Sequence, residues 1–177
     1  MVTISILSDT HVLDVKKAHS FFKFLNRELN NVDYIIHAGD LVTIEVLEAL
    51  QDITRTYAVK GNSDLPGLDH LTSYLDLTLE NQKIGVIHRL EQLDLEIRNA
   101  LDICISGHTH RPEVKEIPKD DGNALLLLNP GSLTKPRAPI AKRFALEVPQ
   151  AQPTFIILEI HDGISSAILK KFPSGKN

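Results

Sequence analysis

The sequence contains very little cysteine and no long hydrophobic run. Its single cysteine, Cys104, lies in the apolar segment LDICIS, so an internal disulfide is excluded and a buried, inert thiol is expected. No apolar run approaches the roughly 18 residues that a membrane span requires, and the N-terminus lacks a charged segment followed by a cleavable apolar one. These absences predict a cytoplasmic protein that does not enter a membrane.

The sequence also lacks any concentration of positive charge. Its 19 Lys and Arg residues are dispersed among 23 Asp and Glu residues, for a net charge of −4. We therefore expect no duplex nucleic acid as a partner, and a small anionic substrate would need local cations or metal ions. The length of 177 residues and the 42% hydrophobic content are ordinary and predict one globular domain over residues 1–177.

Strand and helix patterns alternate in the first part of the chain. Strands are expected at residues 2–7, 33–37 and 54–60, and a helix at residues 43–52. A further helix is expected to begin at Asp14, because apolar residues then recur three and four apart at Val15, Ala18, Phe22, Leu25 and Leu29. This βαβαβ order favours a parallel sheet whose ligands gather at the carboxyl ends of its strands.

The rest of the chain contains more strands than helices. We expect strands at residues 72–79 and 83–88, joined by a hairpin at Asn81, then a helix at 91–100 and a strand at 102–106. Strands at 113–117, 124–129, 154–160 and 165–172 are separated by turn residues, which suggests antiparallel pairing. The predicted fold is a four-layer α/β/β/α sandwich, in which two mixed β-sheets pack together and helices flank them.

Residues that can coordinate a metal follow five of the predicted strands. In chain order they are Asp9 and His11, Asp40, Asn62, His88, and His108 and His110. Asp9 and His11 are two residues apart, so their side chains point the same way if the extended conformation continues. Each motif alone has an ordinary explanation as a helix cap or a turn. Their shared position at strand ends is the informative feature.

This mixture of carboxylate, amide and imidazole groups suits a divalent transition metal such as Mn²⁺, Fe²⁺, Co²⁺, Ni²⁺ or Zn²⁺. Seven ligands exceed the needs of one ion, whereas two ions that share one carboxylate satisfy the count. A pair of ions about 3.5–4 Å apart is an arrangement that hydrolyses phosphate esters. The sequence therefore predicts a phosphoesterase with a dinuclear metal centre.

The strings SDTH, AGDL, KGNSD, VIH and SGHTH, followed by NPGS, resemble the calcineurin-like metallophosphoesterase superfamily over residues 3–137, especially its small single-domain phosphodiesterases. The resemblance implies two ions, with manganese the expected metal, and a bridging hydroxide that attacks phosphorus. It assigns Asp9, His11 and His110 to the first ion, Asn62, His88 and His108 to the second, and Asp40 to the bridge. The candidate catalytic residues are Asp40, Asn62 and His108.

The sequence departs from the family pattern at Ser63 and Arg89. Many members have a histidine at the position of Ser63, where it resembles a general acid, and a hydroxyl is a poor acid near neutral pH. The change favours phosphodiesters over alkyl monoesters. Arg89 replaces a usual glycine and is able to clamp a substrate phosphate, although it can equally point into solvent or pair with Glu91. An arginine would also fit poorly if this position required a positive φ.

Ser63, Arg89 and Asn129 are the candidate substrate contacts, the last because the NPGS turn can approach the metals. His37 precedes the AGD turn and has two interpretations, a core histidine or a residue that orients Asp40. Asp64 similarly fits either a turn or a ligand-orienting role. We assign Cys104 to the core and Ser132 to a turn, and not to a nucleophilic role.

Two other functions fit part of the sequence. One is a noncatalytic protein-binding scaffold that resembles the retromer subunit of this fold, which shares the SGHTH and NPGS strings but departs from the full ligand set. The other is a nuclease, against which the acidic balance argues. We expect a small phosphate ester as the partner, no nucleic acid or membrane, and a homodimer as the commonest type of assembly.

Overall fold

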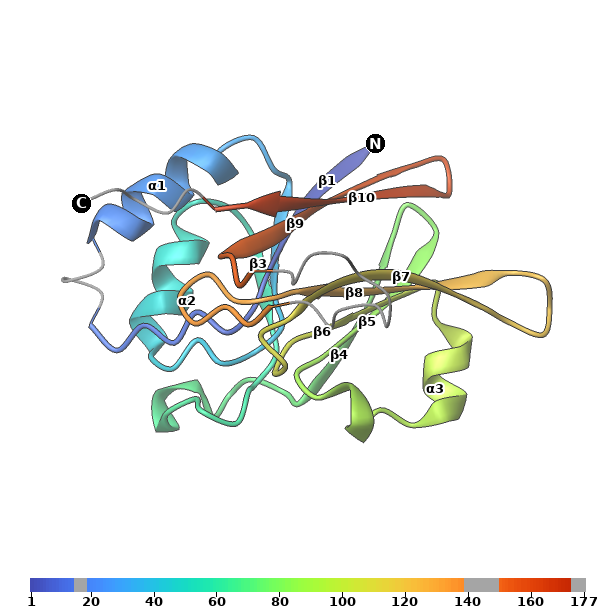
Figure 1. The fold of residues 1–177 in the computed structure, drawn as a ribbon, viewed down its shortest axis with the longest axis horizontal. Helices are drawn as coiled ribbons and strands as arrows, with labels where there is room; N and C mark the ends of the chain where they lie inside the picture. The colour runs from blue at the N-terminus through green and yellow to red at the C-terminus, as the bar shows by residue number, and fades with distance from the viewer. Residues whose placement is uncertain (15–18, 139–149, 173–177) are drawn as a thin grey trace.

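The computed structural model describes residues 1–14, 19–138 and 150–172, which form two five-stranded β-sheets (Figure 1). The first sheet has the strand order β10-β9-β1-β2-β3 and the second has the order β4-β5-β6-β8-β7. The strands of the first sheet are β1 (Val2–Leu7), β2 (Tyr34–His37), β3 (Thr56–Ala58), β9 (Thr154–His161) and β10 (Ile164–Lys171). Those of the second are β4 (Tyr74–Leu79), β5 (Gln82–Ile87), β6 (Ile103–Ser106), β7 (Pro112–Pro118) and β8 (Ala124–Pro130).

Both sheets are mixed, as the sequence predicts. In the first sheet β1, β2 and β3 are parallel, and β9 runs antiparallel to both β1 and β10. In the second sheet β5, β6 and β8 are parallel, whereas β4 and β7 are antiparallel edge strands. The carboxyl ends of the parallel strands therefore meet at one edge of each sheet.

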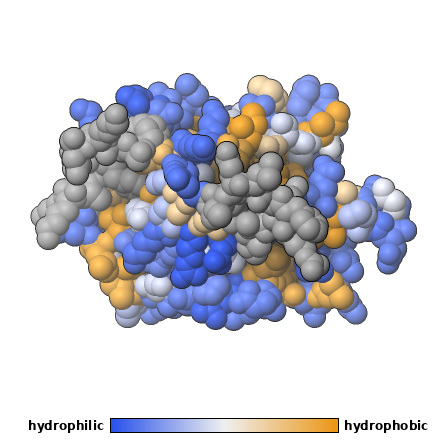
Figure 2. Space-filling model, in the orientation of Figure 1, coloured by the Kyte–Doolittle hydropathy of each residue, from blue (hydrophilic) through white to orange (hydrophobic). Residues whose placement is uncertain are grey.

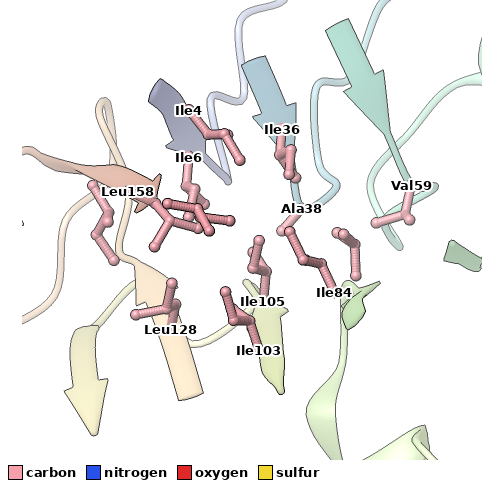
Figure 3. Close-up of a cluster of buried hydrophobic side chains, with 13 residues drawn as sticks. Ile4, Ile6, Ile36, Ala38, Val59, Ile84, Ile103, Ile105, Leu128 and Leu158 are labelled. Carbon is pink, nitrogen blue, oxygen red and sulfur yellow. The ribbon is translucent and has the colours of Figure 1, made fainter. Parts of the chain in front are cut away.

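The main core lies between the two sheets (Figure 3). Ile4, Ile6 and Ile36 of the first sheet face Ile105 and other apolar residues of the second. Ile35, whose side chain points to the opposite face of β2, belongs to a separate cluster under the helices. Because both faces of these strands are covered, apolar residues occur on both of them, as Ile35 and Ile36 do in β2.

The outer face of the first sheet packs against helices α1 (His19–Leu29) and α2 (Ile44–Gln51), which lie on the same side of it in Figure 1. Leu25 and Leu29 of α1 and Leu50 of α2 are fully buried there. The short helices η2 (Leu90–Gln92) and α3 (Leu95–Ala100) lie beside the second sheet, where Leu90 packs against Leu101 and its neighbours. The predicted four-layer sandwich is confirmed.

Two predicted elements differ markedly from the structure in extent, and the start of a third lies outside the described residues. The helix expected at residues 91–100 is divided into η2 and α3, because the Asp94 side chain accepts a hydrogen bond from the Glu96 N–H and begins a new helix. Strand β3 is shorter than predicted, since the Lys60 N–H already bonds to the Thr72 carbonyl oxygen. The predicted start of the first helix includes Val15 and Ala18, which lie outside the described residues.

The Cys104 thiol is buried among apolar residues of the second sheet. The buried position that the sequence predicts is confirmed, and burial raises the pKa of the thiol to about 11. In the described residues, no helix has the length and apolar character needed to span a membrane. The face drawn in Figure 2 shows hydrophobic side chains in separate patches between larger hydrophilic areas.

Candidate metal centre

Loops from both sheets meet at the carboxyl edge of the sandwich. The Gly107 N–H donates to the His88 carbonyl oxygen within the second sheet's loops, at 3.1 Å. Between the sheets, the His108 N–H donates to Oδ2 of Asp9 at 2.9 Å, and the His88 ring bonds to the Ala38 carbonyl oxygen at 2.8 Å. Parallel strands place their polar ends together, as the sequence suggests, and these bonds join the two sheets at that edge.

One group of possible metal-binding atoms is formed by Asp9, His11 and His110, whose ligand atoms all lie within 4.8 Å of one another. Nε2 of His110 is 3.2 Å from Oδ1 of Asp9 and 3.2 Å from Nε2 of His11. Two imidazole nitrogens and a carboxylate oxygen that converge on one point are suitable ligands for a transition metal.

A second group contains Asp9, Asp40 and His88. Oδ1 of Asp40 lies 3.4 Å from Nε2 of His88, and Oδ2 lies 3.4 Å from Nε2 of His11. Asp40 therefore faces one histidine of each group, which is the position of a shared ligand. Oδ1 of Asn62 is 3.2 Å from Nε2 of His88.

His108 lies at the margin of this arrangement. Its ring stands edge-on to that of His88 with the ring centroids 5.2 Å apart, and its side chain belongs to neither of the two groups within 4.8 Å. Burial, together with the positive charge of Arg89, lowers the pKa of His108. Its ring is thus neutral near pH 7, as a metal ligand must be.

Hydrogen bonds fix the orientation of two of the histidine rings. Nδ1 of His88 bonds to the Ala38 carbonyl oxygen at 2.8 Å, and Nδ1 of His110 bonds to the Lys135 carbonyl oxygen at 2.7 Å. A carbonyl oxygen only accepts hydrogen bonds, so Nδ1 carries a proton in both rings, and Nε2 is the nitrogen that a metal would bind once it is deprotonated. The lone pairs then point into the centre, which is the usual tautomer of a metal-bound histidine with a carbonyl partner.

One carboxylate oxygen of Asp9 accepts hydrogen bonds and the other accepts none from the described residues. Oδ2 accepts hydrogen bonds from the Ser8 hydroxyl at 2.6 Å and the His108 N–H at 2.9 Å. Oδ1 is buried and has no hydrogen-bond partner. A buried carboxylate oxygen without a partner is unfavourable, and a bound cation would satisfy it. The donors present therefore fit a pair of divalent transition-metal ions.

Asp40 is ionised in this environment. Burial raises its pKa, but hydrogen bonds from His88 and Ser63 outweigh that effect and hold the pKa well below its usual range. Burial lowers the pKa of His88, whereas its contacts with Asp40 and Ala38 raise it by more. The carboxylate of Asp40 is thus charged at neutral pH and able to coordinate metal.

The backbone is left-handed at five of the seven predicted ligands. The residues and their φ angles are Asp9 (52°), His11 (45°), Asp40 (60°), His108 (67°) and His110 (58°). The extended conformation on which the same-side argument for Asp9 and His11 depended does not continue past β1, because their N–H groups turn to bond with the carbonyl oxygens of Gly39 and Asp40. Such a conformation costs about 1 kcal/mol or more per residue and is often found at functional sites.

His37 and Asp64 form hydrogen bonds to the loops that carry candidate metal ligands. Nε2 of His37 bonds to the Thr10 hydroxyl at 3.1 Å, its Nδ1 has no partner, and burial lowers its pKa to about 3. It is a neutral core histidine that contacts the loop after β1. The Asp64 carboxylate accepts bonds from the N–H groups of Val42 and Gly61, at 2.7 and 2.6 Å, and so connects the loops after β2 and β3.

Two of the predicted substrate contacts lie against candidate metal ligands. Ser63 donates to Asp40 twice, from its N–H at 2.7 Å and from its hydroxyl at 2.9 Å. Arg89 donates to Oδ1 of Asn62 from Nε at 3.3 Å and from Nη2 at 3.1 Å. The backbone of Arg89 has φ −111°, so an arginine fits there without strain.

The third predicted contact, Asn129, is buried within the protein. Its amide donates to the Gly107 carbonyl oxygen at 2.8 Å and to the Thr109 hydroxyl at 3.2 Å, and it accepts from the Gly131 N–H at 2.9 Å. Both amide hydrogens are therefore used to hold the loop after β6. A substrate contact by Asn129 stays a prediction from the sequence.

Sequence reasoning missed the hydroxyl groups that hold the loop after β1. Besides Ser8, these include Ser132, which donates to the Asp9 carbonyl oxygen at 2.7 Å, and Thr134, which donates to the Thr10 carbonyl oxygen at 2.7 Å. The NPGS string indicated a turn at Ser132 but not the segment that the turn would touch. That contact depends on how strands far apart in sequence are ordered.

Comparison with known proteins places this chain in a family. The family model described as the calcineurin-like phosphoesterase superfamily domain matches residues 2–163. A probable metallophosphoesterase of Methanocaldococcus jannaschii is 40% identical over 154 residues, which cover 82% of this chain and 75% of the relative. Another, of Methanothermobacter thermautotrophicus, is 34% identical over 145 residues, or 76% of this chain and 78% of the relative.

Solved structures have the same fold. Wild-type Vps29 of Entamoeba histolytica, complexed with Zn²⁺, is 26% identical with a TM-score of 0.64, and the match covers 97% of this chain and 99% of that one. A novel archaeal phosphodiesterase is 24% identical with a TM-score of 0.62, over 95% of this chain and 99% of that one. The match of the family model to most of the chain, together with these relatives, shows that the chain belongs to the calcineurin-like phosphoesterase superfamily.

Proposed function

We propose that the chain is a phosphodiesterase that depends on two divalent transition-metal ions, with manganese preferred. The proposed ligands are Asp9, His11 and His110 for one ion, Asn62, His88 and His108 for the other, and Asp40 for both. The observation that carries the proposal is the position of the Asp40 carboxylate, whose two oxygens each lie 3.4 Å from a histidine nitrogen of a different group. A small phosphate ester is the proposed substrate, and the cytoplasm is the proposed location.

When bound, the ions supply Lewis acidity that activates water and neutralises charge on the phosphate oxygens. The protein's own contribution is the fixed geometry of its ligands. Ser63 holds both oxygens of Asp40, and Ser8 holds one oxygen of Asp9, so little reorganisation is needed. No protein nucleophile is required, and the Ser132 hydroxyl is already bonded to a backbone carbonyl oxygen.

The preference for diesters rests on the weak acids near the site. The Ser63 hydroxyl donates its proton to Asp40, and the lowered pKa of His108 leaves that ring neutral. Neither group is therefore a good proton donor to a departing alkoxide near pH 7. Substrates whose leaving groups need little protonation are favoured, and activated diesters are the simplest of these.

The test is hydrolysis of bis-p-nitrophenyl phosphate by protein loaded with Mn²⁺. We expect metal-dependent release of p-nitrophenol, a rate about tenfold or more above the release of phosphate from an alkyl monoester such as glycerol 3-phosphate, whose alkoxide needs protonation, and loss of activity with a chelator. Bound metal without hydrolysis of either ester would support the noncatalytic scaffold instead. Cleavage of single-stranded DNA at low enzyme concentration would support the nuclease.

A further inference from the structure

A pocket of about 360 Å³ opens beside the second group of candidate ligands. Its lining residues are Lys60, Gly61, Asn62, Ser73, His88, Arg89 and Gln92. Because Asn62 and His88 are also candidate metal ligands, the pocket is continuous with the place proposed for the scissile phosphate. Its volume is in the range of small-molecule sites, so it suits the part of a substrate that adjoins the reacting group.

The lining of this pocket carries positive charge. It contains Lys60 and Arg89 but no acidic residue, although acidic residues outnumber basic ones by 23 to 19 in the chain as a whole. The Lys60 ammonium pairs with the carboxylate of Asp69. Arg89 donates to the neutral amide oxygen of Asn62 and takes part in none of the ion pairs found among the described residues. The charge of the Arg89 guanidinium is therefore available to bind an anion.

The chemistry of the arginine side chain identifies the anion. A guanidinium has N–H donors in a planar fork that matches two oxygens of a phosphate, and only Nε and Nη2 of Arg89 bond to Asn62. Ser73 and Gln92 add uncharged donors to the wall of the same pocket. The binding groups are thus one cation without an ion-pair partner and several polar side chains, and no hydrophobic residue in the described part of the chain lines the pocket.

We propose that this pocket binds a second phosphate group of the substrate, next to the phosphate that is hydrolysed, and that Arg89 is the residue that selects for it. The inference rests on the proposed phosphodiesterase function and adds the class of substrate, a phosphodiester that carries a further phosphomonoester.

Two chromogenic esters that differ by a single phosphate test the proposal. One is the p-nitrophenyl ester of thymidine 5′-phosphate, and the other carries an additional 3′-phosphate. We expect the ratio of their kcat/KM values to favour the 3′-phosphorylated ester by about tenfold, as for one charge-assisted contact. Arg89→Met should reduce this ratio to near one, and Arg89→Lys should leave an intermediate ratio. Lys115→Met, at an exposed position on β7, should not change it.

Equal kcat/KM values for the two esters in the wild type would overturn the proposal. So would an equal loss on both esters in Arg89→Met, since that result would place Arg89 on the scissile phosphate.

Calorimetric binding of thymidine 3′,5′-bisphosphate and thymidine 5′-phosphate separates this inference from the proposed function. Suppose that the bisphosphate binds about tenfold more tightly and that this difference requires Arg89, but that neither ester is hydrolysed. The proposed phosphate-binding pocket would then be supported, and the proposed phosphodiesterase activity would be refuted. Equal binding of the two nucleotides would refute the pocket.

Discussion

Asp40→Asn should lower the hydrolysis of bis-p-nitrophenyl phosphate by about 10³-fold or more. The two oxygens of Asp40 face histidines of both donor groups, at 3.4 Å each, and the N–H and hydroxyl of Ser63 hold them in that position. An asparagine removes the negative charge and presents an NH₂ group in place of one coordinating oxygen. The proposed ion on that side would lose its bond to the shared carboxylate.

The control for this substitution is Asp76→Asn, which makes the same chemical change at an exposed position of β4. Circular dichroism should show both variants folded, and only Asp40→Asn should lose activity. Retention of more than about a tenth of the wild-type rate by Asp40→Asn would contradict the assignment of Asp40 as the shared ligand.

Gly107→Ala should destabilise the protein by about 3 kcal/mol and also impair the centre. A methyl group at this position would overlap the Ser8 hydroxyl and lie 2.8 Å from the Ala38 carbonyl oxygen and 2.9 Å from Oδ2 of Asp9. These atoms cannot move easily, because the Ser8 hydroxyl and Oδ2 of Asp9 are bonded to each other in a buried position. Displacement of the loop would also strain the bond from the His108 N–H to Asp9.

Urea unfolding in the presence of a chelator measures this effect without a contribution from metal binding. Gly67→Ala is the matched control, since a methyl group there would meet only Ile44 at an ordinary contact distance of 3.6 Å. We expect the control to change the free energy of unfolding by less than about 0.5 kcal/mol. A similarly small effect for Gly107→Ala would show that the two sheets do not approach as closely as described.

The position of the centre could be predicted from the sequence because it depends on local order. The strands before Asp40, His88 and His108 are short and end in buried residues, and each of these polar residues comes within three positions of its strand's end. Strands of this kind align in parallel and bring their carboxyl ends to one edge. The same reasoning predicted two mixed sheets with helices outside.

The internal geometry of the centre could not be predicted in this way. A left-handed backbone at Asp9 and His11 follows from bonds to the carbonyl oxygens of Gly39 and Asp40, which are about 30 residues away in sequence. The contact between Arg89 and Asn62 likewise joins loops of different sheets. Neither feature has a periodic signal, because each depends on tertiary contacts and not on the order of residues within one element.

Anomalous X-ray scattering from crystals grown with Mn²⁺ tests the central claim most directly. The account predicts two manganese peaks about 3.5–4 Å apart, one beside Asp9, His11 and His110 and the other beside Asn62, His88 and His108, with the Asp40 carboxylate between them. A single peak at saturating Mn²⁺, or two peaks that do not share Asp40, would contradict it.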